Sequence, residues 1–219
     1  MLTYCASEAA ARAVAEGIRA RGGEAHVAQA DLCVPGTAGR LVAEAAERLG
    51  GIDGWVNNAG ADIVTGENAK WDWERKLDLI FAVDLKGTMS CCREVVAVMR
   101  AQPRGGTILN MSWDHVTSGM AGGTEELHSA VKGAVLAYSK SLARGVAPEI
   151  RVNVLAPGWI ETAFGEEVDR DFYRGVAEST PLKRWGRPAD VAAAAVYLAS
   201  PDASFLTGQA IYVNGGVVM

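Results

Sequence analysis

The sequence lacks the long apolar runs and the basic clusters that mark membrane and nucleic-acid-binding proteins. A spanning helix needs roughly 20 consecutive apolar residues, and glycine, asparagine or a charged residue interrupts every apolar stretch before that. The 219-residue chain has 21 Lys and Arg against 26 Asp and Glu, a formal net charge of -5. We therefore expect neither a membrane nor a nucleic acid as partner. The first residues also lack the basic start and apolar run of a signal peptide, which favours a cytoplasmic protein.

Cysteine is scarce as well, and its spacing is uninformative for metals or disulfides. Cys5, Cys33, Cys91 and Cys92 form no CxxC motif, so we expect reduced thiols, no disulfide framework and no metal site. Hydrophobic residues make up 49% of the chain and charged residues 21%. These proportions are typical of a globular protein, and the length predicts a single domain over residues 1–219.

Short apolar segments alternate with helical patterns along the whole chain. Strands are expected at 2–5, 25–30, 52–56, 107–111, 151–155 and 210–213, and helices at 7–21, 37–49, most of 71–100, 125–147 and 189–199. This alternation predicts an α/β fold in which helices cover both faces of a parallel sheet. Ligands bind beyond the carboxyl ends of the strands in such sheets. The segments after Val56, Met111 and Leu155 are therefore the first places to look for a site.

Motifs of a known family stand at these strand and helix boundaries. In chain order they are Asn57-Asn58-Ala59-Gly60, Pro157-Gly158-Trp159-Ile160-Glu161-Thr162, Gly186-Arg187-Pro188-Ala189-Asp190-Val191, Leu206-Thr207-Gly208-Gln209 and Asn214-Gly215-Gly216. Together they resemble the short-chain dehydrogenase/reductase family over residues 2–219, which implies a three-layer, Rossmann-like fold. The alternative for each motif is a structural role: the asparagines tie strand ends together, and Pro157-Gly158 is a turn.

The family's amino-terminal strand, glycine-rich turn and helix, which hold the pyrophosphate of a dinucleotide, have no counterpart in this sequence. The segment 2–5 matches the family's second strand, and Cys5-Ala6-Ser7-Glu8 offers no glycine and one negative charge. Glycines let the backbone approach phosphates, and the helix dipole favours anions there. We therefore expect no cofactor. We also expect a six-stranded sheet in the order 2-1-3-4-5-6, with the first strand closed against the strand from Ile52 and filling the cofactor space. The alternative is a groove between these two strands that is too wide by about one strand spacing, roughly 4.8 Å.

The family's catalytic positions also differ. His128-Ser129-Ala130-Val131-Lys132 stands where the family has Tyr-x-x-x-Lys, so histidine replaces tyrosine and only Lys132 is retained. Asp84, in Asp84-Leu85-Lys86-Gly87, replaces an asparagine, and Ser112-Trp113 stands where the family often has a pair of serines. The loop onward to His128 is a few residues longer than usual, so a different loop residue is the alternative for the serine's role.

These residues suggest proton-transfer chemistry. Residues four apart share a helix face, so His128 and Lys132 should be neighbours. A histidine, with an ordinary pKa near 6.5, is a competent general base when neutral and an acid when protonated, and a nearby cation favours the neutral ring. Asp84 could orient that ring. The alternative is a structural histidine and a structural aspartate.

The loop after Ser112 and several tryptophans supply further candidates. Asp114 and His115 form a second possible acid/base set, and exposure in a loop is the alternative for both. The tryptophans, together with Thr162, are candidates to line an apolar pocket for an aromatic or polyketide-like substrate, with core packing as the alternative for at least half of them. The tryptophans considered are Trp71, Trp73, Trp113 and Trp159.

Three functions remain open on the sequence alone. The leading hypothesis is a cofactor-independent, non-redox enzyme, namely a lyase, dehydratase, isomerase or cyclase acting on a small carbonyl substrate. The second is a non-catalytic partner protein, and the third is an NAD(P)-dependent oxidoreductase whose amino terminus is lost. As in the family, a homodimer or homotetramer is expected through the helices at 73–100 and 125–147, with Val95, Val98 and Met99 as contact residues.

Overall fold

Strands and helices follow one another as the sequence predicts. The computed structural model describes residues 1–162, 165 and 168–219. Its strands are β1 (Leu2–Tyr4), β2 (Val27–Gln29), β3 (Gly54–Asn57), β4 (Gly106–Met111), β5 (Ile150–Pro157) and β6 (Ala210–Val213). Its helices are α1 (Glu8–Ala20), α2 (Thr37–Leu49), α3 (Trp73–Ile80), α4 (Thr88–Ala101), α5 (Glu125–Val146), α7 (Arg170–Ser179) and α8 (Pro188–Ala199). Short 3-10 segments lie at η1 (Gly66–Lys70), η3 (Asp114–Val116) and η4 (Pro201–Ala203), and η2 (Phe81–Gly87) is a π-helix.

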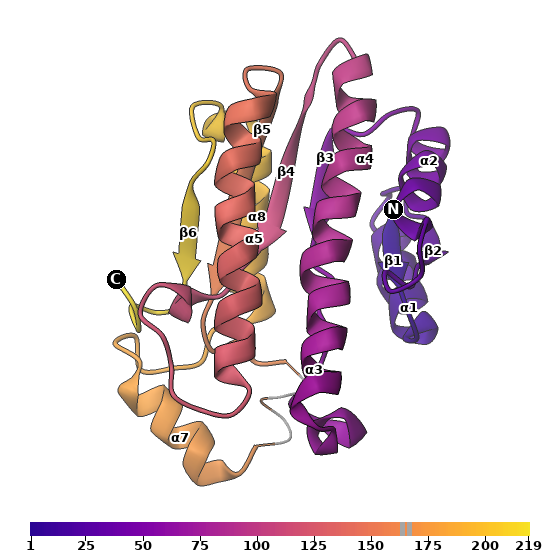
Figure 1. Cartoon of the computed structure of the whole chain (residues 1–219). Coiled ribbons are helices and arrows are strands. Elements are labelled where there is room, and N and C mark those ends of the chain that lie inside the picture. The colour runs from indigo at the N-terminus through magenta and orange to yellow at the C-terminus, as the bar shows by residue number, and fades with distance from the viewer. Residues whose placement is uncertain (163–164, 166–167) are drawn as a thin grey trace.

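The strands form two parallel sheets, and the expected single sheet in the order 2-1-3-4-5-6 is wrong. β1 pairs with β2, and the second sheet has the order β3-β4-β5-β6. Figure 1 shows β1, β2, α1 and α2 grouped at one side of the molecule, beyond α4 and β3. Val42 and Ala45 of α2 pack with Val95 and Met99 of α4 in one buried cluster. This helix contact holds the amino-terminal unit in place although β1 and β3 are not paired.

The edge of β3 that faces the amino-terminal unit (β1, α1, β2 and α2) has no paired strand among the described residues. Val56, in the middle of this apolar strand, is 51% exposed, whereas the strands further into the sheet are buried along most of their length. β1 therefore does not occupy the space beside β3 in the way the sequence analysis expected.

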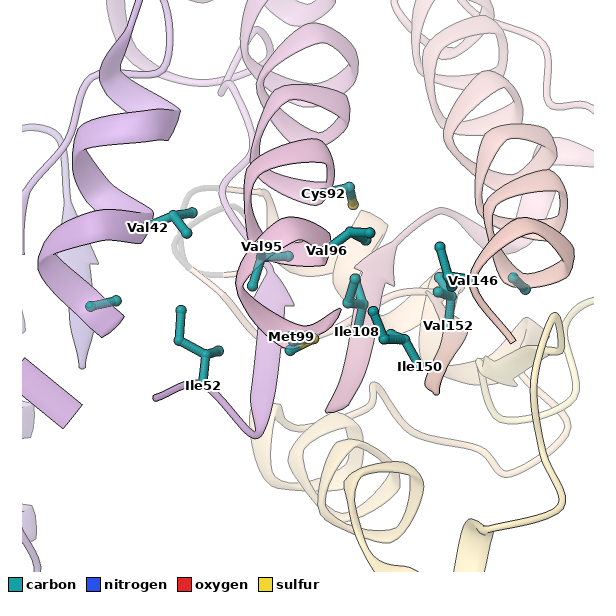
Figure 2. Close-up of a cluster of buried hydrophobic side chains, with 12 residues drawn as sticks. Val42, Ile52, Cys92, Val95, Val96, Met99, Ile108, Val146, Ile150 and Val152 are labelled. Carbon is teal, nitrogen blue, oxygen red and sulfur yellow. The ribbon is translucent and has the colours of Figure 1, made fainter. Parts of the chain in front are cut away.

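The four-stranded sheet has helices on both faces, as predicted for a three-layer fold. Successive side chains of a strand point to opposite faces, and accordingly Ile108 of β4 packs into the cluster under α4 and α5, whereas Leu109 packs with Leu198 of α8. Figure 2 shows Ile108 and Val152 of the sheet with Val95 of α4 in the first cluster. This core fixes where each strand ends, and hence where the following loops begin.

Buried polar side chains connect the strands near their carboxyl ends. Asn57 Nδ2 donates to Asn110 Oδ1 at 2.7 Å, and Asn110 Nδ2 donates to Ser139 Oγ of α5 at 2.8 Å. The indole N–H of Trp55 donates to Asn57 Oδ1 at 2.8 Å. The structural interpretation of Asn57 is thus confirmed.

The cysteines and the proposed contact residues are partly as expected. Cys5 and Cys33 are exposed, and Cys91 and Cys92 are buried in the packing of α4. Val95 and Met99 are fully buried in the monomer's own core, so their expected role in contacts between subunits is wrong. Self-association itself stays a prediction. No helix within the described part of the chain is long and apolar enough to cross a membrane.

Substitution of Gly105 tests how tightly the turn between α4 and β4 is packed. Gly105 has a φ of +64°, and an added Cβ would lie 1.9 Å from the backbone oxygen of Glu149. We expect Gly105→Ala to lower the free energy of unfolding by about 3 kcal/mol, because backbone strain and a clash with rigid backbone add together. In the control, Gly145→Ala in α5, the new methyl meets no atom within 4 Å, so stability should rise by about 0.5–1 kcal/mol. Urea unfolding measures both, and equal effects would contradict the packing described.

Candidate active site

The loops after β3, β4 and β5 leave the sheet at the same edge. Asn57 of β3 is in register with Asn110 of β4, and Met111 of β4 with Leu155 of β5, in parallel pairing. Lys132 Nζ of α5 reaches the carbonyl oxygen of Met111 at 3.4 Å. The amino-terminal half of α5 thus lies over the carboxyl end of β4, where the fold predicts a site.

A buried ion pair joins α5 to the π-helix η2. Lys132 Nζ lies 2.7 Å from Asp84 Oδ2, and the two side chains are 13% and 2% exposed. The other carboxylate oxygen, Asp84 Oδ1, accepts a hydrogen bond of 2.7 Å from the backbone N–H of Ala61, in the loop after β3. An ideal Cβ at Gly60 would lie 3.3 Å from Asp84 Oδ2, so this close approach suits glycine. Asp84 was expected to orient the His128 ring, but its side chain pairs with Lys132 instead.

His128 lies one turn before Lys132, with its ring held by backbone. Its Nδ1 lies 3.1 Å from the carbonyl oxygen of Thr124. A carbonyl oxygen only accepts, so Nδ1 carries the hydrogen, and in the neutral ring Nε2 is left as the proton acceptor. Thr124 was missed by sequence reasoning; its place four residues before His128, at the start of α5, is the signal that could have indicated it.

The Ser112 hydroxyl is used inside the protein. Ser112 Oγ donates to the carbonyl oxygen of Lys132 at 2.9 Å, and its backbone N–H donates to Leu155 O at 2.8 Å. These bonds attach the end of β4 to both α5 and β5. The structure therefore gives Ser112 a structural position.

The next residue, Trp113, contacts both histidines of this edge. Its ring centroid lies 6.1 Å from that of His128 in an edge-to-face arrangement and 5.1 Å from that of His115 in a tilted one. The His115 Nδ1 is 3.3 Å from Ser118 Oγ. The structure thus brings together Trp113, His115 and His128, all predicted from the sequence.

Asp114 is buried rather than exposed in the loop. It is 0% exposed, and its Oδ1 has no hydrogen-bond partner among the described residues. Its Oδ2 accepts from Asn214 Nδ2 at 3.2 Å, and His115 Nε2 lies 3.9 Å from Oδ1. Burial raises the pKa of Asp114, and His115 and the Asn214 hydrogen bond oppose that rise. The carboxyl is thus buried in the protein and tied to the segment after β6.

The tryptophans expected to form one pocket do not meet among the described residues. Trp159 packs edge-to-face on Phe172 and Trp185, at centroid distances of 5.6 and 5.5 Å. Trp71 instead lies against the guanidinium of Arg75, and no ring contact joins Trp159 to Trp113 in the part of the chain that the structure describes.

Two other exposed candidates stand apart from these ring contacts. Trp73, at the start of α3, is 51% exposed, and Thr162 is also exposed. The shared aromatic pocket inferred from the sequence is therefore not assembled by these side chains.

The described residues also bear on metals and cofactors. No three His, Cys, Asp or Glu side chains are grouped as metal ligands within the described ranges. A pyrophosphate does not fit the turn from β1 into α1, because Cys5, Ala6 and Ser7 supply no glycine and Glu8 occupies the first helical turn, 2.6 Å from Arg12. This turn therefore supplies no phosphate site, and the residues of the strand edge supply groups for proton transfer.

Comparison with known proteins identifies the family. The family model described as enoyl-(acyl carrier protein) reductase matches residues 1–218. The 3-oxoacyl-[acyl-carrier-protein] reductase of Staphylococcus epidermidis is 33% identical over 220 residues, which cover 100% of this chain and 88% of the relative. The chain belongs to the short-chain dehydrogenase/reductase family.

Other relatives agree with this assignment. An uncharacterized oxidoreductase of Mycobacterium tuberculosis is 36% identical over 208 residues, covering 94% of this chain and 77% of the relative. A mutant of a Serratia marcescens short-chain dehydrogenase/reductase has a similar structure, with a TM-score of 0.88 and 26% identity over 99% of this chain and 86% of that one. The Rossmann-like α/β fold expected from the motifs is confirmed.

The comparison with relatives contradicts the leading functional hypothesis. The relatives of this short-chain dehydrogenase/reductase are named as reductases and oxidoreductases. The prediction of a cofactor-independent lyase, dehydratase, isomerase or cyclase is therefore wrong. It failed because it rested on a few local differences from the family pattern, whereas family membership follows from similarity along the whole chain.

The Asp84–Lys132 pair should be important for stability. Lys132→Met leaves a buried carboxylate without its partner, and we expect the free energy of unfolding to fall by about 3–5 kcal/mol. Lys70 makes an equally short ion pair of 2.7 Å with Glu67, but the two side chains are 71% and 84% exposed. Lys70→Met should therefore cost about 1 kcal/mol or less. Urea unfolding compares the two variants, and similar losses would contradict a buried pair.

Asp114 gives a pH dependence of defined sign. A folded-state pKa above the unfolded value means that the folded protein binds the proton more tightly, so ionisation of Asp114 lowers stability as pH rises. We expect Asp114→Asn to be more stable than the wild type at pH 7, and the difference to shrink as pH falls toward about 4, the ordinary pKa of aspartate.

Asp190 is the matched control, because Arg184 and the backbone N–H of Arg187 lower its pKa to about 2. Asp190→Asn should be less stable than the wild type at pH 7, with the deficit lost only as pH falls from about 4 toward 2. Urea unfolding at several pH values measures both variants. A constant difference for Asp114→Asn across this range would refute the raised pKa.

Proposed function

We propose that this chain is an atypical NAD(P)-dependent oxidoreductase that interconverts a carbonyl group and an alcohol on a small molecule. Family membership and the names of the relatives support the reaction class. The chain is atypical in two respects: histidine at position 128 and aspartate at position 84.

The observation that carries the proposal is the orientation of His128. With Nδ1–H bound to the Thr124 carbonyl at 3.1 Å, Nε2 is the nitrogen left for a substrate. In the reducing direction the protonated ring gives the Nε2 proton to the carbonyl oxygen, and in the oxidising direction the neutral Nε2 takes the proton of the hydroxyl. In such enzymes the dinucleotide supplies the hydride chemistry, and the protein supplies the proton and the positioning.

Lys132 and Asp84 have a positioning role in this proposal. The lysine charge is matched by the carboxylate at 2.7 Å, so the pair fixes α5 relative to the loop after β3. His128 lies one turn away on the same helix, and its place at the strand edge depends on that attachment.

Turnover tests the proposal directly. The purified chain is titrated with NADH and NADPH by fluorescence, and oxidation of each is followed with ethyl acetoacetate, a small 3-oxo ester, as probe. We expect binding and turnover with at least one of the two dinucleotides. Absence of both binding and turnover with both dinucleotides would refute an NAD(P)-dependent function.

Variants of His128 test the proton donor. His128→Ala should lower kcat by about 100-fold or more, the usual contribution of a positioned acid or base, whereas His128→Tyr, which restores the family's residue, should retain more activity than His128→Ala. His26 pairs with Glu24 at the start of β2, so His26→Ala serves as the control and should leave kcat unchanged. Undiminished turnover in His128→Ala would remove this residue from the reaction.

A further inference from the structure

The site has a proton donor in His128, but the hydroxyl expected beside it is engaged elsewhere. Ser112 is 6% exposed, and its Oγ donates to the carbonyl oxygen of Lys132 at 2.9 Å. A hydroxyl has one hydrogen to donate, and here that hydrogen is used to hold α5. Ser112 is therefore unable to donate to a substrate oxygen without giving up this bond.

The indole N–H of Trp113 is a neighbouring hydrogen-bond donor that is not already used. Trp113 has an extended backbone, with φ of -142° and ψ of 148°, directly before the short helix η3. Its half-buried ring lies edge-to-face with His128 at 6.1 Å and against His115 at 5.1 Å. No described residue accepts a hydrogen bond from its Nε1, and that nitrogen is not among the fully buried polar atoms that lack a partner. The N–H is thus unpaired without being sealed inside the protein.

Contacts on both sides hold this ring in place. Asp114, the next residue, is fully buried and bonded through Oδ2 to Asn214, and Ser112, the preceding residue, is bonded to β5 and α5. With both neighbours fixed and two imidazole rings against it, the indole has little freedom to move. A donor fixed before substrate arrives needs no reorganisation during the reaction, which is the condition for effective stabilisation of a developing negative charge.

We propose that Trp113 is a catalytic residue whose indole N–H donates a hydrogen bond to the substrate's carbonyl oxygen. This inference rests on the proposed carbonyl reduction. The indole is a donor only, so it keeps its hydrogen throughout. The proton that becomes the alcohol hydrogen comes from Nε2 of protonated His128, which is left neutral. Trp113 therefore stabilises the oxygen as negative charge develops, and His128 changes protonation state.

The first test removes the N–H and keeps an aromatic ring. Trp113→Phe should lower kcat for ethyl acetoacetate about 100-fold, the scale for loss of one such donor, while KM changes much less. Trp73, which is 51% exposed at the start of α3, provides the control, and Trp73→Phe should turn over at the wild-type rate. Wild-type kcat in Trp113→Phe would overturn the proposal.

The second test reports on the hydrogen bond without turnover. The chain has six tryptophans, and in a 15N–1H correlation spectrum the Trp113 indole signal is identified by its loss in Trp113→Phe. Ethyl acetoacetate at increasing concentration should move this signal in a saturable manner, in the wild type and in His128→Ala, while the Trp73 signal stays in place. An unmoved Trp113 signal would overturn the proposal. A saturable shift in a protein that binds and oxidises neither NADH nor NADPH would support this donor and refute only the proposed oxidoreductase function.

Discussion

The buried ion pair between Asp84 and Lys132 is the interaction on which the arrangement of the site depends. It joins η2 to α5, and through hydrogen bonds to Ala61 N and Met111 O it also fixes the loop after β3 and the end of β4. A buried pair is tolerated when the remaining donors and acceptors of both groups are also satisfied. Here Asp84 Oδ1 accepts from Ala61 N and Lys132 Nζ also reaches Met111 O, and so three parts of the chain that are distant in sequence meet at the strand edge.

The two substitutions at family positions are physically connected. According to the resemblance, the family's lysine acts on a tyrosine, and its charge makes that phenol able to exchange a proton. A histidine exchanges protons near neutral pH without such help, and a free cation beside it would oppose the protonated form. Asp84 at 2.7 Å matches the lysine charge, and the Thr124 carbonyl takes over the orientation of His128. Aspartate at position 84 and histidine at position 128 are therefore compatible with each other in the proposed function.

Local sequence patterns predicted the helices and strands. The sheet order, by contrast, depends on packing between elements that are distant in sequence. The helix over 37–49 and the strand over 210–213 have the predicted bounds, and Gly50, with a φ of +68°, ends that helix as a glycine C-cap should. The sheet order was wrong because strand pairing depends on how α2 sits against α4, and no local pattern encodes that contact.

The difference between local patterns and long-range packing also explains the other features that the sequence did not predict. Helix α7 was not foreseen because its apolar positions are few among charges; the usable signal was Asp169, whose carboxylate accepts from the N–H groups of Asp171 and Phe172. In the site, helix periodicity placed His128 beside Lys132 correctly. The tryptophans, by contrast, stand on loops whose paths the sequence does not specify, so Trp159 joined Phe172 and Trp185 and only Trp113 came to the histidines.

The two buried carboxyl groups of this edge differ in their surroundings, and that difference suits a reaction on a carbonyl oxygen. Asp84 has a lysine in contact, so its charge is balanced within the protein. Asp114 has an amide donor and a histidine at 3.9 Å in place of a lysine, and burial raises its pKa, which favours the acid form. At this edge the charge of Asp84 is thus matched by a cation, and burial works against the charged form of Asp114, so the protein limits the negative charge that a carbonyl oxygen beside His128 and Trp113 would meet.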